Sequence, residues 1–376
     1  MYSVAALMRS CKKRCLAIAV ASEFLLTSIL CAPVSAQSPE SVLRTPTCAA
    51  CRIEVTRLFT LDNGPENTQL EDWPSSIAMD SHGRVALAVR GGRGLAVLYD
   101  SLGRSPRRIG RIGGGPNEYK YPGAVAFGSE DTLSVFDIQL SRRTELIRPD
   151  RYVGSSTYLG RSVRLRLLPT GDALVVSSWG SNRFQVHSRT GTLLREWGPS
   201  RPPVPGGTRI PATFISNVVA NRFWSVNAET YELEQWTIDG TRIARMRRSA
   251  GWLDTKRKIS DGSLGTQPTT YVTDLHIDKE GRLWVLVNVA SNDWKEGLKE
   301  PDKKEGFTSY PHRDFGLLYD SVVEVIDIKS MKLLQSVRIP GYLRFILSDS
   351  HLASLRQSED GSPVVDLWRV QMTSIP

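Results

Sequence analysis

The chain has 376 residues, 40% of them hydrophobic and 23% charged, with a formal net charge of +9. This length suffices for a large buried core, arranged as one large β domain or as two smaller ones. The excess of positive charge is modest for so large a body and indicates a solvated surface. Together with the export signal described next, it gives no reason to expect nucleic acid as a partner.

Residues 1–36 have the pattern of a secretory signal peptide. Basic residues at positions 9–14 precede a short apolar core at residues 24–32, and small residues precede a predicted cleavage before Gln37. Glu23 interrupts the wider apolar run, which argues against a membrane-spanning helix of about 20 residues. We therefore predict export to the periplasm or the extracellular space and a mature chain that does not span a membrane. A retained anchor and lipidation at Cys31 are the alternatives.

The N-terminal segment of the mature chain, residues 37–52, contains the two cysteines that remain after removal of the leader, Cys48 and Cys51. In an oxidising compartment such a pair is more often a disulfide than two free thiols, so we predict a local structural disulfide. A redox role, or a shared metal or partner crosslink, are the alternatives. Arg52 stands where a c-type haem motif requires histidine, so no haem is expected.

From residue 53 to residue 376 the sequence repeats one pattern: an apolar strand, a short polar turn and a second apolar strand. Periods of about 40–50 residues that are built only of strands are typical of β-propeller blades. The sequence therefore predicts an all-β fold, a six-bladed β-propeller. The first apolar residues after the six turns are Val85, Leu133, Ala173, Phe223, Leu283 and Leu352.

The sixth copy of the pattern is incomplete. Only one strand, Val364–Val370, follows its first pair, and an unassigned strand candidate, Ile53–Leu61, precedes the first copy. We predict that Ile53–Leu61 lies beside Val364–Val370, which closes the ring and removes two exposed sheet edges.

A glycine-rich turn joins the first two copies. Its glycines can adopt positive φ and expose backbone N–H groups. We expect the Glu118 carboxylate to accept hydrogen bonds from these groups and Tyr119 to pack beneath them. A phosphate-binding loop would need a Gly-Lys-Ser/Thr ending and a following helix, whereas a strand follows here. We predict a structural turn made by Gly113, Gly114, Gly115, Pro116, Glu118 and Tyr119.

The turn Gly113–Pro122 (G-G-G-P-N-E-Y-x-x-P) and two D-x-x-G-R turns, Asp80–Val85 and Asp278–Leu283, resemble the NHL-repeat-like, six-bladed propeller proteins of bacteria. The resemblance spans nearly all of the mature chain. It implies six four-stranded blades, with the ring closed by a strand from each terminus, and it implies no single activity.

Strand alternation places the joins between strand pairs and between blades at one end of the propeller, and every long insertion falls there: 198–213, 248–270 and 288–320. Such loops often carry function in scaffold proteins. Arginine presents a rigid fork of donors to carboxylate or phosphate, so arginines on three neighbouring blades predict a basic arc. The alternative for the arginines is that each pairs with a nearby acid. The alternative for the insertion at 288–320 is a solvated loop without a ligand role. The predicted ligand-binding residues are Arg93, Arg143, Arg183 and Trp294.

The sequence gives no catalytic signature. Its five histidines are scattered without metal-ligand spacing, and no Gly-x-Ser-x-Gly elbow is present, so we predict no catalytic residue, no metal and no cofactor. Asp274, His276 and Asp278 form the one acid–His–acid cluster, on one face of a predicted strand, where a structural polar group is expected.

These features predict an exported, monomeric, non-enzymatic scaffold. It is expected to bind a protein, or an anionic small-molecule or glycan ligand, through the long-loop face. The alternatives are a propeller hydrolase or lyase with a channel-bound divalent metal, and a sensor or assembly module of a larger envelope complex.

Overall fold

The computed structural model describes residues 40–62, 64, 68–89, 95–147, 151–157, 164–177, 182–200, 212–253, 265–304, 307–309 and 314–374. The chain divides into two compact units, Met1–Gln37 and Ser38–Pro376, and the second holds every described residue. The predicted leader, residues 1–36, lies outside the described residues. Within the described part, no helix is long and apolar enough to cross a membrane.

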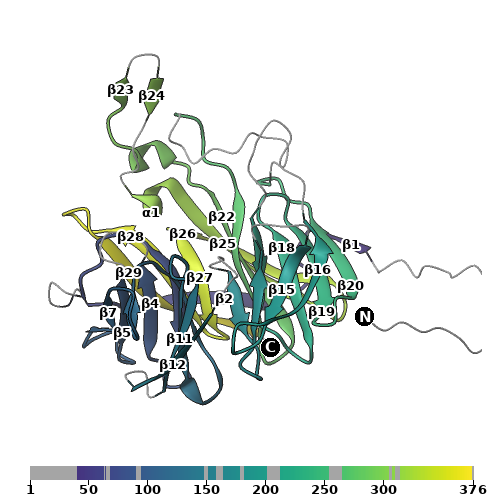
Figure 1. Cartoon of the computed structure of the whole chain (residues 1–376). Helices are drawn as coiled ribbons and strands as arrows, with labels where there is room; N and C mark the ends of the chain where they lie inside the picture. The colour runs from purple at the N-terminus through teal and green to yellow at the C-terminus, as the bar shows by residue number, and fades with distance from the viewer. Residues whose placement is uncertain are drawn as a thin grey trace, which may run out of the picture. The chain divides into compact units, whose positions relative to one another are not determined.

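The fold is all-β, with six blades arranged as a propeller (Figure 1). Each blade is built on four antiparallel strands. In blades 1 to 5 these four strands lie side by side in the order in which they occur in the sequence. Blade 1 contains β3 (Pro74–Met79), β4 (Val85–Val89), β5 (Leu95–Tyr99) and β6 (Arg107–Arg108). Blade 2 contains β9 (Pro122–Phe127), β10 (Leu133–Asp137), β11 (Arg142–Ile147) and β12 (Arg151–Thr157). Blade 3 contains β13 (Leu165–Leu167), β14 (Ala173–Val176), β15 (Asn182–His187) and β16 (Leu193–Pro199).

Blade 4 contains β17 (Thr213–Ile215), β18 (Arg222–Asn227), β19 (Glu232–Thr237) and β20 (Arg242–Arg248). Blade 5 contains β21 (Tyr271–Ile277), β22 (Arg282–Ala290), β25 (Tyr319–Asp327) and β26 (Lys332–Pro340). Between β22 and β25 the chain forms η3 (Trp294–Gly297), a hairpin of β23 (Asp302–Lys304) and β24 (Phe307–Ser309), and α1 (Phe315–Leu318). This hairpin projects beyond the sheets in Figure 1.

Blade 6 combines the two ends of the described chain. It contains β27 (Leu343–Ser348), β28 (His351–Gln357), β29 (Pro363–Ser374) and, as its fourth strand, β2 (Cys51–Thr60). The strands β2 and β29 pair antiparallel, with Ile53 opposite Met372 and Val55 opposite Val370. The vacant place left by the sixth sequence copy is therefore occupied by the segment that precedes the first copy.

The second strand of each blade explains why the repeat is so apolar. Every residue of β4 is at most 1% exposed. Val85, Leu87 and Val89 pack in a cluster shared with blade 6, whereas Ala86 and Ala88 pack in a cluster shared with blade 2. Because both faces of the sheet are covered by neighbouring blades, alternation of apolar and polar residues is lost in this strand.

The D-x-x-G-R turns are built by their aspartates. The Asp80 carboxylate accepts the backbone N–H groups of His82 at 2.9 Å and Arg84 at 2.8 Å, while Gly83 adopts a φ of +80°. Asp278 accepts the N–H of Arg282 at 2.8 Å in the same way. A short acid that bonds its own backbone, followed by a glycine in a left-handed conformation, fixes each tight reversal between first and second strands.

Residues 40–50 run along the outer edges of two blades, which the sequence analysis did not predict. The strand β1 (Glu40–Leu43) adds to blade 4 in parallel with β20, as Figure 1 shows. The chain then crosses to blade 5, where the N–H of Cys48 donates to the Leu334 carbonyl at 3.1 Å. The predicted disulfide between Cys48 and Cys51 is confirmed and lies at the start of β2.

Candidate functional site

A cavity of about 600 Å³ lies where the first strands of the blades begin. Residues from β3, β13, β17, β21 and β27 line it, together with Tyr121 just before β9, so all six blades contribute. The three long insertions begin and end here, because β16, β20 and β22 end and β17, β21 and β25 start at this end of the propeller. Pockets of this size typically accommodate a small organic ligand. The turns between first and second strands lie at the opposite end.

Aromatic rings from three blades form one side of the cavity. Phe315 of α1 stacks on Tyr342 with ring centres 5.3 Å apart, and Trp73 meets Phe315 edge-on at 5.4 Å. Tyr319 contacts both Tyr342, at 5.6 Å, and Tyr271, at 5.5 Å. We call Trp73, Tyr271, Phe315, Tyr319 and Tyr342 the ring wall. Edge-to-face and offset contacts of this kind hold rings in fixed orientations, so the wall is preorganised.

Three arginines also line the cavity. The Arg164 guanidinium lies 4.3 Å above the Phe214 ring, and Arg166 donates from Nη2 to the Asp274 carboxylate at 2.7 Å. Arg344 lies 5.5 Å from the centre of the Phe345 ring. Within the described part of the chain, no ion pair joins Arg344 to a carboxylate. Arg344 thus differs from Arg166, whose charge is already paired.

Arg344 occupies a β-bulge. The register between β27 and β28 shifts after Leu343, which faces Ser354, because Phe345 faces Ala353. Arg344 is therefore the extra residue on β27. Bulges re-aim side chains and are over-represented beside functional sites.

Tyr271 stays protonated over the ordinary pH range. Burial raises the pKa of Tyr271 well above its usual value, and the neighbouring hydroxyls of Tyr342 and Tyr319 raise it further, although the Arg344 guanidinium opposes this. The Tyr271 hydroxyl is 2.9 Å from that of Tyr342. The pair acts as a hydrogen-bonded support of the ring wall rather than as a base.

Two residues of the predicted arginine arc, Arg143 and Arg183, are not in the lining of this cavity. Arg143 is 4% exposed; it pairs with Glu145 at 2.7 Å and donates to the Gly171 carbonyl of blade 3 at 2.6 Å. Arg183 is 6% exposed and pairs with Glu234 of blade 4 at 2.8 Å. Both guanidinium groups therefore join their own blade to the next. Arg93 lies outside the described residues.

Trp294 belongs to η3 and packs against the apolar cluster shared by blades 1, 5 and 6. Lys295 lies 5.8 Å from its ring centre, and Trp294 is absent from the cavity lining. The described residues of this insertion that line the cavity are Phe315 and Tyr319. A ligand role for Trp294 and for the three predicted arginines stays a prediction.

The glycine-rich turn ends at the rim of the cavity. The Glu118 carboxylate accepts the N–H of Gly115 at 2.6 Å and the Nε–H of Arg111 at 2.6 Å, and Tyr119 is buried. The Asp137 carboxylate then accepts the N–H of Tyr121 at 3.0 Å. These bonds fix the chain at the point where Tyr121 enters the cavity lining.

The acid–His–acid cluster is divided among separate partners. Asp274 accepts hydrogen bonds from Arg166 and from the Ile346 N–H at 2.9 Å. His276 Nε2 is 2.7 Å from Asp349 of blade 6. Asp278 accepts from Arg282 and from the Trp284 indole. Each group serves a turn or a junction between blades, and they do not converge on one reacting atom.

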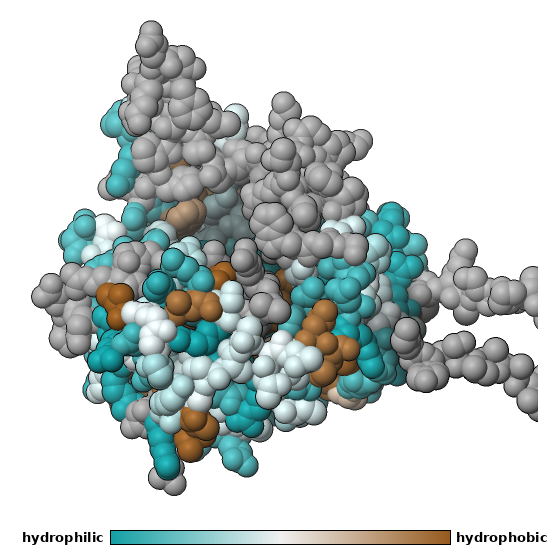
Figure 2. All heavy atoms as spheres, in the orientation of Figure 1, coloured by the Kyte–Doolittle hydropathy of each residue, from teal (hydrophilic) through white to brown (hydrophobic). Residues whose placement is uncertain are grey.

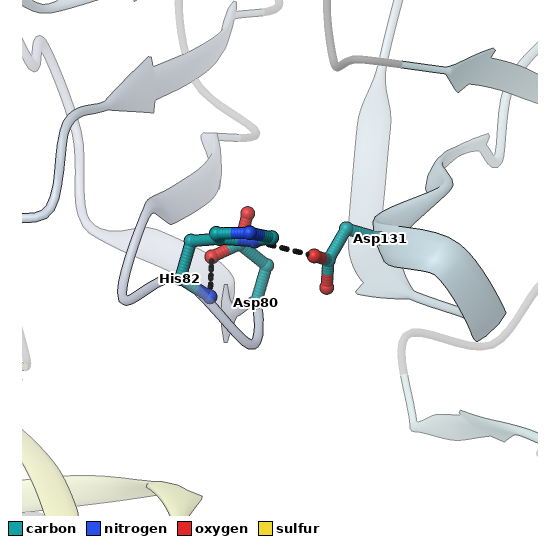
Figure 3. A group of neighbouring side chains, drawn as sticks. All are labelled: Asp80, His82 and Asp131. Atoms are coloured by element: carbon teal, nitrogen blue, oxygen red, sulfur yellow. Dashed lines mark hydrogen bonds and ion pairs between the residues drawn. The ribbon is translucent and has the colours of Figure 1, made fainter.

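A different cluster brings together groups that can ligate a metal. Asp80, His82 and Asp131 place one ligand atom each within 4.8 Å of the others (Figure 3). His82 Nδ1 is 2.7 Å from Asp131, which also accepts the Ser81 N–H at 3.0 Å, and the Asp80 oxygens accept from its own turn. Asp131 thus joins blade 2 to blade 1, and Asp80 is engaged within its own turn, at the end opposite the cavity.

The apolar surface gives no broad contact area in the view drawn. Hydrophobic residues form separate spots within a largely hydrophilic surface in Figure 2. Single exposed apolar side chains are normal, whereas large contiguous patches mark interfaces. We therefore take the cavity as the candidate binding site.

Comparison with known proteins rests on structure alone, because no family model and no curated protein matches the sequence. A member of the DUF4221 family from Bacteroides vulgatus is similar with a TM-score of 0.55 and 11% identity, over 86% of this chain and 99% of that chain. The protein is a six-bladed β-propeller.

Two further similarities are weaker. Virginiamycin B lyase from Staphylococcus aureus has a TM-score of 0.44 and 10% identity, over 86% of this chain and 100% of that chain. A gluconolactonase from Xanthomonas campestris has a TM-score of 0.45 and 11% identity, over 88% of this chain and 98% of that chain. Identities this low concern the fold and not the activity.

Proposed function

We propose that this protein is an exported binding propeller that takes a small ligand into its central cavity, without carrying out chemistry on it. The observation that carries the proposal is the cavity at the long-loop end, lined by an ordered ring wall and by arginines from blades 3 and 6. Aromatic side chains with a few polar groups that fix orientation are the usual composition of ligand pockets.

Two titratable groups of the cavity, Asp274 and Tyr271, support binding rather than catalysis. Asp274 is held by Arg166 and by backbone N–H groups, and Tyr271 retains its proton. A general base must have a free lone pair within reach of its substrate. The metal-assisted alternative gains no support from the described residues, because the cluster able to ligate a metal lies at the other end and is engaged.

Export is supported by the signal-like leader and by the Cys48–Cys51 disulfide, since disulfides persist in oxidising compartments. The expected mature N-terminus is Gln37 and the expected state is a monomer. N-terminal sequencing of protein recovered from the periplasm or the medium checks the first point, and light scattering checks the second. Recovery of the protein from the cytoplasm with residues 1–36 still attached would contradict export.

Filling the cavity tests the binding function. Ala212 lines the cavity, so Ala212→Trp should occupy the space that a ligand needs. Lys279→Trp is the control, because the Lys279 side chain is 79% exposed in a turn at the opposite end. Compounds from a metabolite library that raise the melting temperature of wild type and of Lys279→Trp should fail to raise that of Ala212→Trp. Compounds that stabilise all three proteins equally would place binding elsewhere.

A further inference from the structure

Arg344 is a positive charge held in the cavity without an acidic partner in the described part of the chain. Arg166 pairs with Asp274, and Arg57 and Arg356 share the Asp366 carboxylate in the same blade as Arg344. A half-buried guanidinium beside rings is weakly hydrated and keeps its fork of donors available for a carboxylate, sulfonate or phosphate.

Arg344 has aromatic neighbours in the cavity. Arg344 lies against Phe345 in a cation–π arrangement, and its charge acts on Tyr271 of the ring wall. An anion bound at Arg344 is therefore next to aromatic surface. A ligand that satisfies both features carries one anionic group and a flat apolar ring.

Four hydroxyl groups of the cavity are not available to a polyhydroxylated ligand. Ser75 donates to the Gly123 carbonyl at 2.8 Å, Ser76 to the Val125 carbonyl at 3.2 Å, and Thr270 to the Trp252 carbonyl at 3.0 Å. Thr273 donates to the Leu286 carbonyl at 3.3 Å. A sugar ring needs donors as well as acceptors around its hydroxyls, and these four donors are already used inside the protein.

From these contacts we infer that the cavity is selective for an aromatic anion, with the charged group on Arg344 and the ring against Phe315 and Trp73. This inference rests on the proposed binding function and gives it a ligand class. Of the two anionic classes expected from the sequence, small molecules and glycans, it selects the first.

Matched dyes test the inference on the purified protein. The probe is 1-anilinonaphthalene-8-sulfonate, and N-phenyl-1-naphthylamine is the neutral compound with the same ring system. Both are titrated by fluorescence, with near-UV circular dichroism recorded to verify that the protein remains folded. Wild type should bind the sulfonate at least tenfold more tightly than the neutral dye, because a hydrogen bond to a charged group contributes about tenfold to hundredfold.

Two variants separate charge from ring contact. Arg344→Gln should lose about tenfold or more of sulfonate affinity and none of the affinity for the neutral dye. Phe315→Ala should weaken both dyes. Arg338→Gln is the control, because Arg338 pairs with Asp320 on the outer part of blade 5 and is absent from the cavity lining. Arg338→Gln should bind both dyes as wild type does.

The outcomes distinguish failure of the inference from failure of the proposed function. Equal affinity for the two dyes, or an unchanged preference in Arg344→Gln, overturns the ligand class but leaves the binding cavity standing. Tighter binding of an oligogalacturonate than of the sulfonate, lost in Arg344→Gln, would overturn the choice of a small aromatic anion over a glycan. Absence of binding by both dyes and by the oligogalacturonate would remove support for the cavity function itself.

Discussion

Arg248 and Glu324 form an ion pair between blades 4 and 5, with Arg248 Nη2 and Glu324 Oε1 2.8 Å apart and side chains only 4% and 0% exposed. Tyr231 and Ser336 donate to the same carboxylate at 2.7 Å and 3.0 Å. Arg248 Nη1 donates to the carbonyl of Arg44 at 2.6 Å. One guanidinium thus joins two blades and the N-terminal segment.

Removal of one partner of this pair should be strongly destabilising. Arg248→Ala leaves a buried carboxylate without its counter-charge, and such losses cost about 3–5 kcal/mol. Urea denaturation at pH 7 measures the change. The control is Arg338→Ala, whose ion pair with Asp320 is 42% exposed on the arginine side, with an expected loss of about 1 kcal/mol or less. Similar losses in the two variants would show that the Arg248–Glu324 pair does not hold the blades together.

The junction between blades 5 and 6 should depend on pH. The hydrogen bond from His276 is the main cause that lowers the pKa of Asp349, against an opposing effect of burial. A carboxyl whose pKa is lowered in the folded state stabilises it above the unfolded value of about 3.9, and this contribution is lost as pH falls through the lower folded value.

Asp349→Asn should therefore lower the unfolding free energy at pH 7, by about 1 kcal/mol or less because the side chain is partly exposed. The difference from wild type should shrink as the pH falls below about 4. Urea titrations at several pH values measure it. Glu130→Gln, an exposed acid in the equivalent turn of blade 2, is the control and should show no such trend. A deficit that stays constant down to pH 3 would rule out the ionic contribution.

The fold was predictable from sequence because each blade repeats the same burial. Val85, Leu133 and Leu283 are all completely buried, and each follows a turn whose aspartate or glycine is visible in the sequence. The strand β1 was not predictable in this way. Its four residues, Glu40–Leu43, lie outside the repeated pattern, and nothing in their sequence identifies β20 as their partner.

The cavity was less predictable than the fold. Strand connectivity predicted that Arg143 and Arg183 lie at joins on the long-loop face, and in the structure they pair with Glu145 and Glu234 at contacts between blades. Arg344 gave no signal in the sequence, since it reaches the cavity through a bulge in β27. In the ring wall Trp73 contacts Phe315, which stacks on Tyr342. Trp73 lies far from these two residues in the sequence and meets Phe315 only because the propeller closes into a circle. The repeat pattern therefore does not predict the direction of a side chain at an irregular strand position such as Arg344.

Contact between blades 2 and 3 requires the absence of a side chain at Gly191. A Cβ atom there would lie 1.7 Å from the Thr157 carbonyl oxygen of β12, and the residue has a φ of +92°. Gly281 has a similar φ of +77° with open space around it. Gly281→Ala should cost about 1 kcal/mol from backbone strain alone. Gly191→Ala adds overpacking against a backbone atom and should cost about 2–4 kcal/mol. Thermal denaturation of the two variants measures both losses of stability. Equal losses would show that the close contact between Gly191 and Thr157 does not constrain the packing of blades 2 and 3.

The Cys48–Cys51 disulfide should contribute modestly to stability and nothing to ligand binding. It closes a loop of four residues, for which the chain-entropy model gives about 2 kcal/mol. Backbone bonds already hold both sides of this loop, from Cys48 to Leu334 and through the pairing of β2 with β29. The double variant Cys48→Ser/Cys51→Ser should therefore remain folded, unfold at a slightly lower urea concentration, and bind the aromatic sulfonate as wild type does. Loss of sulfonate binding in a folded double variant would instead connect this outer edge of the propeller to its cavity.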